Sequence, residues 1–454
     1  MPIKVLIVYD NGVFLDRRVE HQLEVLKKIN CEVTFLCPQV SKEQISYALP
    51  VGIKRIFLDD INSLTSELRL KLTNLIKLSD NFFYPLKNIR NKEGRVNKWG
   101  VLFLLFQASF FSPKDTFSFL KTLLLYFFKK KLPNLFNRLA KQKIIKDLKE
   151  INFEPTHIHV HDLCLLSFGV DLKNYFNCKL FYDSHEIYFQ QFQEGSSQWN
   201  HWKRLENTLI GSVDLLISVN QYCIDVISSE HQFNGKTKVL SNAVKLIAED
   251  EGGNPKTSRL SIIHDIRKSN KNSKILIFQG GLNPLRNIDE LLAGFSFLSK
   301  DYYLILISFP MDCLIYQKKC KELEIDKNVY FLCDLKWQEV ISIAENCDAG
   351  IIPYQLTSLN AFAATPNKMY EFFAAGVPII ANNKLERVQK LILENKNGYT
   401  GELTDGASYG NLIREAFAFF EKNRTKLKKA LRETKAKYNY RDEEQTLIDI
   451  YLEK

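Results

Sequence analysis

The sequence lacks the cysteine patterns of disulfide-bonded and zinc proteins. It has nine cysteines, but they stand mostly inside or beside apolar runs, without a C-x-x-C pair or a zinc-type spacing. We therefore expect reduced thiols and a cytoplasmic location. A signal-peptide pattern is absent too, because the apolar run from Ile3 to Val8 is too short and leads into Tyr9 and Asp10 without a cleavage site. We interpret this run as a first strand.

Two common nucleotide-binding motifs are also missing. The expected first strand is followed by Asp10-Asn11-Gly12-Val13 rather than by G-x-G-x-x-G, which disfavours a dinucleotide-dependent dehydrogenase. Gly235-Lys236-Thr237 lacks the upstream glycine of a P-loop, which disfavours a P-loop NTPase.

No apolar run reaches the ~20 residues of a membrane-spanning helix. The longest candidates lie in the region 66–146, which contains Val101–Phe106 and Phe117–Phe128, followed by three lysines. Two interpretations stay open. These aromatic and basic segments lie in an anionic membrane interface, or they are helices packed on the first domain with a solvated lysine face. The net charge of +10 does not decide between lipid, nucleic acid and phosphorylated substrates.

The pattern of apolar runs predicts a doubly wound α/β fold in each of two domains. A chain of 454 residues is too long for one core and suits two domains of roughly 200 residues each. Short, nearly unbroken apolar runs alternate with helical segments, as in parallel sheets covered on both faces. The runs span 3–9, 33–37, 157–160, 179–182, 214–219, 274–279, 302–307, 348–352 and 377–381.

A charged stretch rich in glycine and proline, 248–255, interrupts this pattern, and the next strand begins only at Lys274. We place the domain junction near residue 244, with a first domain over 1–243 that carries the insertion at 66–146, and a second domain over 244–437. The segment 438–454 is expected to form a helix.

One helix of the second domain carries the strongest signal for a ligand. Thr365 suits the N-cap, Pro366 the first helical position, and Gly376 ends the helix. This helix follows the strand at 348–352, so its N-terminus, with Asn367 and Lys368, lies at the carboxyl edge of the sheet, where amide groups and the helix dipole favour a diphosphate. Glu371 within it is a candidate to bind a ribose diol; the alternative is a structural salt bridge with a nearby Lys or Arg.

A glycine turn follows the strand at 274–279. Gly280 and Gly281 let the backbone approach a ligand closely, and Arg286 can bind phosphate oxygens with two hydrogen bonds. A surface turn with a solvated arginine is the alternative. Both this turn and the helix after 366 follow strands of one sheet and are expected to face one cleft.

Three polar strand ends are candidates in the first domain. His157, His159 and His161 alternate along one strand, but three such positions span ~13 Å, too far to share one metal ion. His161 is therefore interpreted as a hydrogen-bonding or proton-handling group. Asp162 follows the same strand as His161. The other candidates follow two further expected strands: His185 and Glu186 come after the strand at 179–182, and Asn11, Gly12 and Arg17 come after the first strand.

At these residues the chain resembles glycosyltransferase family four, which has the GT-B fold of two Rossmann-like domains facing a central cleft. The resemblance covers nearly the whole chain except 60–150. It rests on Asp16 with Arg17-Arg18-Val19, Ile158-His159-Val160-His161-Asp162, Tyr182-Asp183-Ser184-His185-Glu186, Gln279-Gly280-Gly281 with Arg286, and Pro366-Asn367-Lys368 through Glu371 to Gly376-Val377-Pro378.

The resemblance implies retaining transfer of a sugar, without a catalytic metal or other cofactor, from a nucleotide diphosphate sugar to an acceptor on the first domain. By position, Glu371 matches the carboxylate that holds the donor ribose, Arg286 the basic residue on the diphosphate, and His161 the histidine near the reacting sugar. The terminal helix should cross back onto the first domain. Ala363 departs from the family, which often has a second glutamate there.

We therefore expect a transferase of cell-surface polysaccharide synthesis. Its partners would be the donor and a glycan or lipid-linked acceptor, with an anionic membrane surface as an open alternative and no nucleic acid. Two rival functions remain: a nucleotide-sugar epimerase of the same fold, which would convert the donor without an acceptor, and a non-catalytic scaffold that kept the fold.

Overall fold

The computed structural model describes residues 2–12, 15–38, 47–58, 133–245, 260–356, 358–363 and 365–453. The apolar runs at 101–106 and 117–128, and with them most of the expected insertion, lie outside the described residues. The end of that insertion belongs to α5 (Pro133–Glu150), which packs on the first sheet through Ile144, Ile145 and Leu148.

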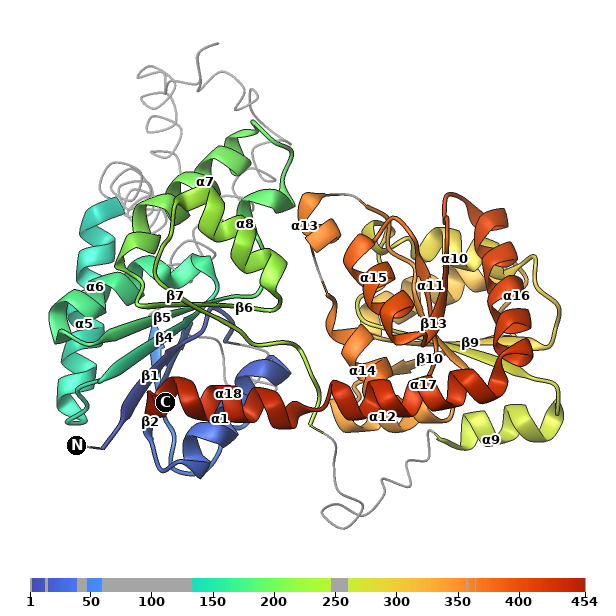
Figure 1. Ribbon diagram of the computed structural model, residues 1–454, viewed down its shortest axis with the longest axis horizontal. Helices are drawn as coiled ribbons and strands as arrows, with labels where there is room; N and C mark the ends of the chain where they lie inside the picture. Colours follow the sequence, from blue (N-terminus) through green and yellow to red (C-terminus); the bar gives the residue numbers. More distant parts are fainter. Residues whose placement is uncertain are drawn as a thin grey trace, which may run out of the picture.

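The first sheet has seven parallel strands in the order β3-β2-β1-β4-β5-β6-β7 (Figure 1). Buried side chains of successive residues point to opposite faces; Leu6 and Val8 join one apolar cluster, and Val5 and Ile7 join another. The strands are β1 (Lys4–Val8), β2 (Glu32–Pro38), β3 (Lys54–Leu58), β4 (His157–His161), β5 (Lys179–Ser184), β6 (Leu215–Ser218) and β7 (Lys236–Val239). Besides α5, the helices are α1 (Arg17–Lys28), α6 (Leu166–Phe176), α7 (Ser197–Leu209) and α8 (Gln221–His231).

The second sheet has six parallel strands in the order β10-β9-β8-β11-β12-β13. They are β8 (Lys274–Gln279), β9 (Tyr302–Ser308), β10 (Val329–Cys333), β11 (Ala349–Ile352), β12 (Ile379–Asn382) and β13 (Gly398–Gly401). The helices are α9 (Leu260–Ser269), α10 (Ile288–Phe295), α11 (Pro310–Glu322), α12 (Trp337–Glu345), α13 (Leu359–Ala363), α14 (Asn367–Ala375), α15 (Glu386–Asn395), α16 (Gly406–Lys422) and α17 (Arg424–Lys437). The prediction of two doubly wound parallel sheets is confirmed.

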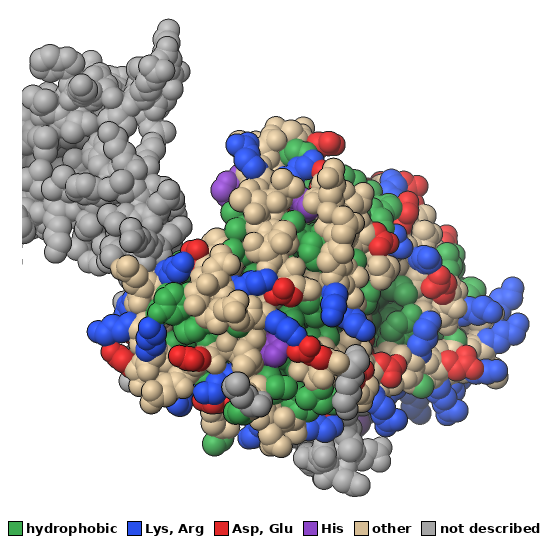
Figure 2. Space-filling model, turned by 60° about the vertical axis from the view of Figure 1, so that its left-hand side comes forward, with side chains coloured by type: hydrophobic (Ala, Val, Ile, Leu, Met, Phe, Trp, Pro, Cys, Tyr) green, Lys and Arg blue, Asp and Glu red, His purple; other side chains and the backbone are tan. Residues whose placement is uncertain are grey.

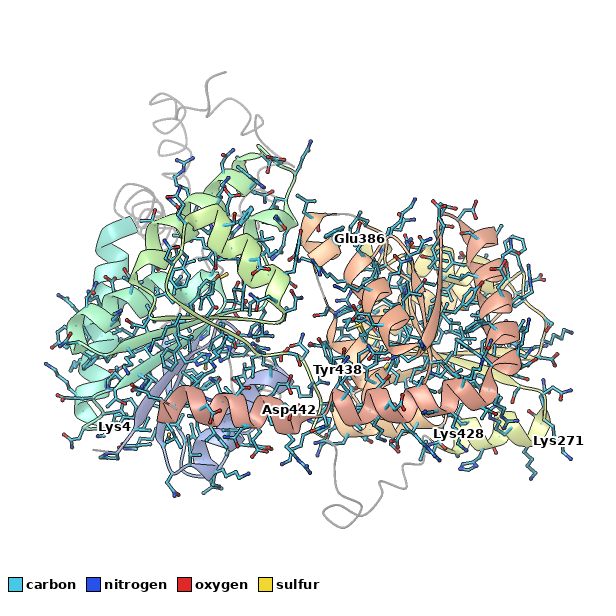
Figure 3. All side chains as sticks on the ribbon, in the orientation of Figure 1. Lys4, Lys271, Glu386, Lys428, Tyr438 and Asp442 are labelled. Carbon is cyan, nitrogen blue, oxygen red and sulfur yellow. The ribbon has the colours of Figure 1, made fainter. Side chains whose placement is uncertain are left out.

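The last helix, α18 (Tyr440–Leu452), lies along α1 of the first domain, although it follows α17 of the second (Figure 1). Figure 3 shows the crossing between Tyr438, beside the second domain, and Asp442, beside the first. The crossing is fixed where the Tyr440 amide donates to the Val244 carbonyl at 3.3 Å. Two chain segments therefore connect the domains.

The charged side chains do not gather into one basic patch on the face that Figure 2 shows, where Lys and Arg lie among Asp and Glu. Within the described ranges, no helix has the length and apolar character needed to cross a bilayer.

Candidate functional site

Both sheets reverse their strand order once, and polar loops follow the strands on each side of the reversal. In the first sheet the reversal lies between β1 and β4, and in the second between β8 and β11. Open parallel sheets bind ligands at the carboxyl ends of such strands. Asn11 and Gly12 follow β1, Asp162 follows β4, and Gly280 and Gly281 follow β8.

The glycine turn after β8 brings two cations together. Gly280 has a φ of 122°, which L-residues rarely adopt. A Cβ on this residue would lie 2.6 Å from Arg286 Nη1 and 3.5 Å from Lys368 Nζ, so the two side chains flank the glycine. Arg286 reaches there from the short 3-10 helix η6 (Pro284–Arg286), and Lys368 from the first turn of α14.

These cations have no carboxylate within ion-pair distance among the described residues. Lys368 is buried, contacts the Tyr354 hydroxyl, and lies 4.5 Å from the centre of the Tyr354 ring. The Arg286 guanidinium lies 5.7 Å from the same ring and donates to the Gly281 carbonyl at 3.3 Å. Arg286 acts on the Glu186 carboxyl only from beyond ion-pair distance. Two adjacent positive charges without a close acidic partner in the described part of the chain favour a multiply charged anion.

Helix α14 adds its N-terminus to this site, with one correction to the expected capping. The helix begins at Asn367, with Pro366 in the N-cap position, and no side chain caps it. The Thr365 side chain is instead buried towards Asn220, whose Nδ2 donates to it at 3.4 Å. The helix is one residue shorter than expected because Pro366 has the extended ψ of 146°. Gly376 ends it in the left-handed conformation, as predicted.

Both carboxylate oxygens of Glu371 are engaged. Oε1 accepts from Arg17 Nη1 at 2.5 Å, and Oε2 accepts from Gln279 Nε2 at 2.7 Å. Arg17 comes from α1, so a residue expected on the acceptor side reaches the carboxylate expected to bind the donor. The salt bridge left open as an alternative for Glu371 is therefore present in this structure.

In the first domain, Arg18 and Asp183 form a buried ion pair. Arg18 Nε and Nη2 donate to the two oxygens of Asp183 at 2.9 and 2.6 Å. Burial opposes ionisation, but Arg18 and the neighbouring His159 and His185 hold the pKa of Asp183 well below its usual range. Ligand atoms of His159, His161 and Asp183 lie within 4.8 Å of one another, a spacing that could hold a metal ion. Arg18 already neutralises this carboxylate, so the group is better explained as a hydrogen-bonded network.

His161 lies inside this network. Its Nε2 lies 2.7 Å from Gln22 Oε1, which can only accept, so Nε2 carries the proton. Its Nδ1 lies 3.1 Å from His185 Nε2. Burial and the neighbouring His159 push the pKa of His161 well below its usual value, which keeps the ring neutral. Both ring nitrogens are thus occupied, and the side chain is fully buried.

His185 is the histidine of this cluster with access to solvent, because 18% of its side chain is exposed. Burial disfavours its charged form, but the Asp162 carboxylate at 3.5 Å and the Asp183 carboxylate at 3.7 Å outweigh burial and raise its pKa to about 9. Asp162 has a φ of 67°, and its Oδ1 accepts from the His185 amide at 3.2 Å. The carboxyl ends of β4 and β5 therefore present an imidazolium beside carboxylates.

Helix α13 joins the two halves of the site. Asn360 on this helix accepts from the Ile187 amide at 2.9 Å and donates to Glu186 at 3.2 Å. Ala363, where the resembled family often has a glutamate, is fully buried in a core cluster of the first domain. A glutamate there would bury a charge, so the substitution suits the close contact between the domains.

Several residues that complete the site had no predicted role. Arg18, Asp183 and Gln279 belong to the motifs on which the family resemblance rests. Their residue types and their positions at strand ends or a helix start could have indicated a role. Tyr354 is the second residue after β11 and carried the weaker signal of an aromatic residue near a strand end. Tyr451 contacts Gln22 across 429 residues, and nothing local could have indicated it.

Comparisons with known proteins identify a similar family and similar folds. Residues 261–437 match the family described as glycosyl transferases group 1. No curated protein matches the chain. Among solved structures, the chain is similar to sucrose-phosphate synthase from Thermosynechococcus elongatus, with 14% identity, a TM-score of 0.63 and coverage of 99% of this chain and 98% of that one.

Two further structures match over their length. HepE of Anabaena, in complex with UDP and glucose, has 14% identity, a TM-score of 0.62 and complete coverage of both chains. WaaG, a glycosyltransferase involved in lipopolysaccharide biosynthesis, has 11% identity, a TM-score of 0.59 and 99% coverage of both chains. The chain therefore has the GT-B fold, and the match of its second domain to glycosyl transferases group 1 supports a glycosyltransferase.

Proposed function

We propose that the protein transfers a sugar, with retention of configuration, from a nucleotide diphosphate sugar to a glycan or lipid-linked acceptor in cell-surface polysaccharide synthesis. The observation that carries this proposal is the pair of cations, Arg286 and Lys368, beside Gly280. A diphosphate matches their charge and spacing, and the N-terminus of α14 adds amide donors on the same side.

In the proposed reaction, the bond between the anomeric carbon and the diphosphate oxygen breaks, and its electron pair leaves with the diphosphate. Arg286, Lys368 and the N-terminus of α14 stabilise the charge that develops there, which lowers the barrier without a catalytic metal. The acceptor hydroxyl bonds to the anomeric carbon, and its proton passes to the departing diphosphate.

The remaining groups have supporting roles in this proposal. Glu371 binds the donor ribose after exchanging its contact with Arg17. His185 and Asp162 are proposed to contact the acceptor hydroxyl, together with Asn11, Gly12 and Glu186. His161 is a positioning residue, because its Nδ1 contacts His185 while Gln22 holds its Nε2. The protein is proposed to work in the cytoplasm, at the inner face of a membrane when its acceptor is lipid-linked.

The test is a thermal-shift panel of UDP, GDP, ADP and their sugars on the wild type, Glu371→Ala and Arg286→Ala/Lys368→Ala. A ligand at 100 times its Kd stabilises the native state by about 2.7 kcal/mol. We expect one nucleotide to shift the wild type, and the shift to be lost in the cation double variant and reduced in Glu371→Ala. A nucleotide shift that survives loss of both cations would disprove this donor site. Conversion of the donor sugar without an acceptor would show an epimerase instead.

A further inference from the structure

The outer face of α11 is apolar, where the solvent-facing side of a helix is normally polar. The helix packs on the second domain through the buried residues Cys313, Tyr316 and Cys320. Met311, Leu314 and Ile315 lie on the opposite side, with 69%, 62% and 65% of their surface exposed. The first two turns of α11 therefore carry apolar side chains on two opposite sides. The described residues cover only the side that faces the second domain.

Two neighbouring side chains enlarge this surface. Phe309, directly before α11, is 64% exposed, and Leu285 of η6 is 75% exposed. Asp312 of α11 connects the chain segments that carry these two side chains. It accepts from the Leu282 amide, before Leu285, at 2.9 Å and from Ser308 Oγ, before Phe309, at 3.1 Å. We call Leu285, Phe309, Met311, Leu314 and Ile315 the apolar rim. Single exposed apolar residues need no explanation, but a group of five large ones marks an interaction surface.

The apolar rim lies beside the proposed donor site. Strands β8 and β9 are paired in register, and the Gly280 amide donates to the Ile307 carbonyl at 2.9 Å. Phe309 follows the end of β9, and Leu285 directly precedes Arg286. The rim is therefore at the same carboxyl edge of the sheet as the two cations.

The charges around the rim favour an anionic partner. The acidic residue within it, Asp312, turns inward to its two hydrogen bonds, whereas Lys318 follows Leu314 and Ile315 by one turn and is 83% exposed. Lys321 on the same helix is exposed as well. Glu322, 4.0 Å from Lys318 and 64% exposed, offsets the charge of one of these two lysines and leaves the other in excess.

We propose that the apolar rim is a membrane-contact surface, whose five side chains enter the interface of an anionic bilayer while Lys318 and Lys321 contact lipid headgroups. Large apolar side chains flanked by lysines are the features that hold a helix in such an interface. This contact would bring a lipid-linked acceptor to the donor site. That role rests on the proposed function, whereas the membrane contact itself does not depend on it.

The experiment measures sedimentation of the full chain with vesicles of phosphatidylcholine, alone or mixed with phosphatidylglycerol. We expect the wild type to sediment with the mixed vesicles at low salt. Leu314→Ser/Ile315→Ser should weaken binding by roughly tenfold or more, because burial of each side chain is lost. The matched control is Leu356→Ser/Leu393→Ser, which removes two exposed leucines outside the rim and should bind like the wild type.

A second pair of variants tests the charges. Lys318→Glu/Lys321→Glu should weaken binding to mixed vesicles by roughly fivefold or more, as expected for lysines close to an anionic surface. Lys428→Glu/Lys429→Glu makes the same change in charge on exposed positions of α17 and should have a smaller effect.

Three results would overturn the membrane contact. The first two are no sedimentation of the wild type, and sedimentation of Leu314→Ser/Ile315→Ser equal to that of the wild type. The third is a dimer in light scattering that this variant abolishes, which would show that a second copy covers the rim. A nucleotide shift retained by these variants shows that they fold, and keeps failure of the membrane contact separate from failure of the proposed function.

Discussion

Arg17 of the first domain and Glu371 of the second lie 2.5 Å apart, and only 9% and 13% of their side chains are exposed. Arg17 also donates to the Asn242 carbonyl at 3.1 Å, and Gln279 occupies the other oxygen of Glu371. The pair therefore ties α1 to α14, and with it the first domain to the proposed donor site. Donor binding at Glu371 would have to replace this contact, which couples nucleotide binding to the contact between the domains.

Arg17→Ala should lower the free energy of unfolding by about 2 kcal/mol, because it leaves a largely buried carboxylate with one partner. The measurement is a urea double-mutant cycle with Glu371→Ala in the absence of nucleotide. We expect a coupling energy above about 1 kcal/mol, as for residues in direct contact. Additive effects of the two substitutions would show that the ion pair contributes no stability of its own.

Gly280→Ala should weaken binding of the nucleotide that stabilises the wild type by roughly tenfold or more. The new Cβ would lie 2.6 Å from Arg286 Nη1, and the φ of 122° is strained for alanine, so the cation must move. Titration calorimetry checks this. Gly195→Ala is the control, because Gly195 also has a positive φ, 77°, but a Cβ there meets nothing within 4 Å. Equal loss in both variants would point to general backbone strain rather than to the position of Arg286.

The strands that the sequence analysis predicted differ physically from those that it missed. Its nine apolar runs correspond to the nine strands that have a neighbour on each side: β1, β2, β4, β5, β6, β8, β9, β11 and β12. The missed strands are β3, β7, β10 and β13, the four sheet edges. An edge strand need not be apolar throughout, and Lys236-Thr237-Lys238-Val239 of β7 is exposed at every residue.

The site shows a similar division between local and distant features. Gly280, Arg286 and Lys368 could be predicted because each belongs to a short motif directly after a strand or at a helix start. The contacts of Arg17 with Glu371 and of Gln22 with Tyr451 could not, since they join residues 354 and 429 positions apart. The capping role expected for Thr365 was wrong, because local propensity gave way to contacts with Asn220 and Asn242 across the domain junction.

The raised pKa of His185 predicts how its contribution to stability depends on pH. Because the folded pKa of about 9 exceeds the ordinary 6.5, the contribution is complete below pH 6.5 and is lost as the pH rises through about 9. The wild type should exceed His185→Gln in free energy of unfolding by about 2 kcal/mol at pH 6, and this advantage should shrink towards pH 9.5.

Urea unfolding at several pH values measures that advantage. The same comparison with His201→Gln, an exposed position on α7, should give little difference at any pH. An advantage for His185 that grows with pH would contradict the assignment of a charged imidazolium beside Asp162 and Asp183.

The last helix provides a comparison between two buried tyrosines. The Tyr451 hydroxyl lies 2.8 Å from both Gln22 Nε2 and His159 Nδ1, within the network that orients His161. Tyr440 is also buried, but its hydroxyl has no hydrogen-bond partner among the described residues. Removing the Tyr451 hydroxyl takes one hydrogen-bond partner from each of two buried groups, which keep their contact with each other at 2.8 Å. Removing the unpartnered Tyr440 hydroxyl instead relieves a desolvation cost.

Tyr451→Phe should therefore lower the free energy of unfolding by about 1–3 kcal/mol, while Tyr440→Phe should leave it unchanged or raise it slightly. Both substitutions keep the ring and its packing, so urea unfolding of the two variants isolates the hydroxyl. If the network also positions His185 through Gln22 and His161, the pH dependence of His185 should shift in Tyr451→Phe and stay unchanged in Tyr440→Phe. A loss of stability that is larger in Tyr440→Phe would show that α18 is held by its start rather than by the histidine network at its end.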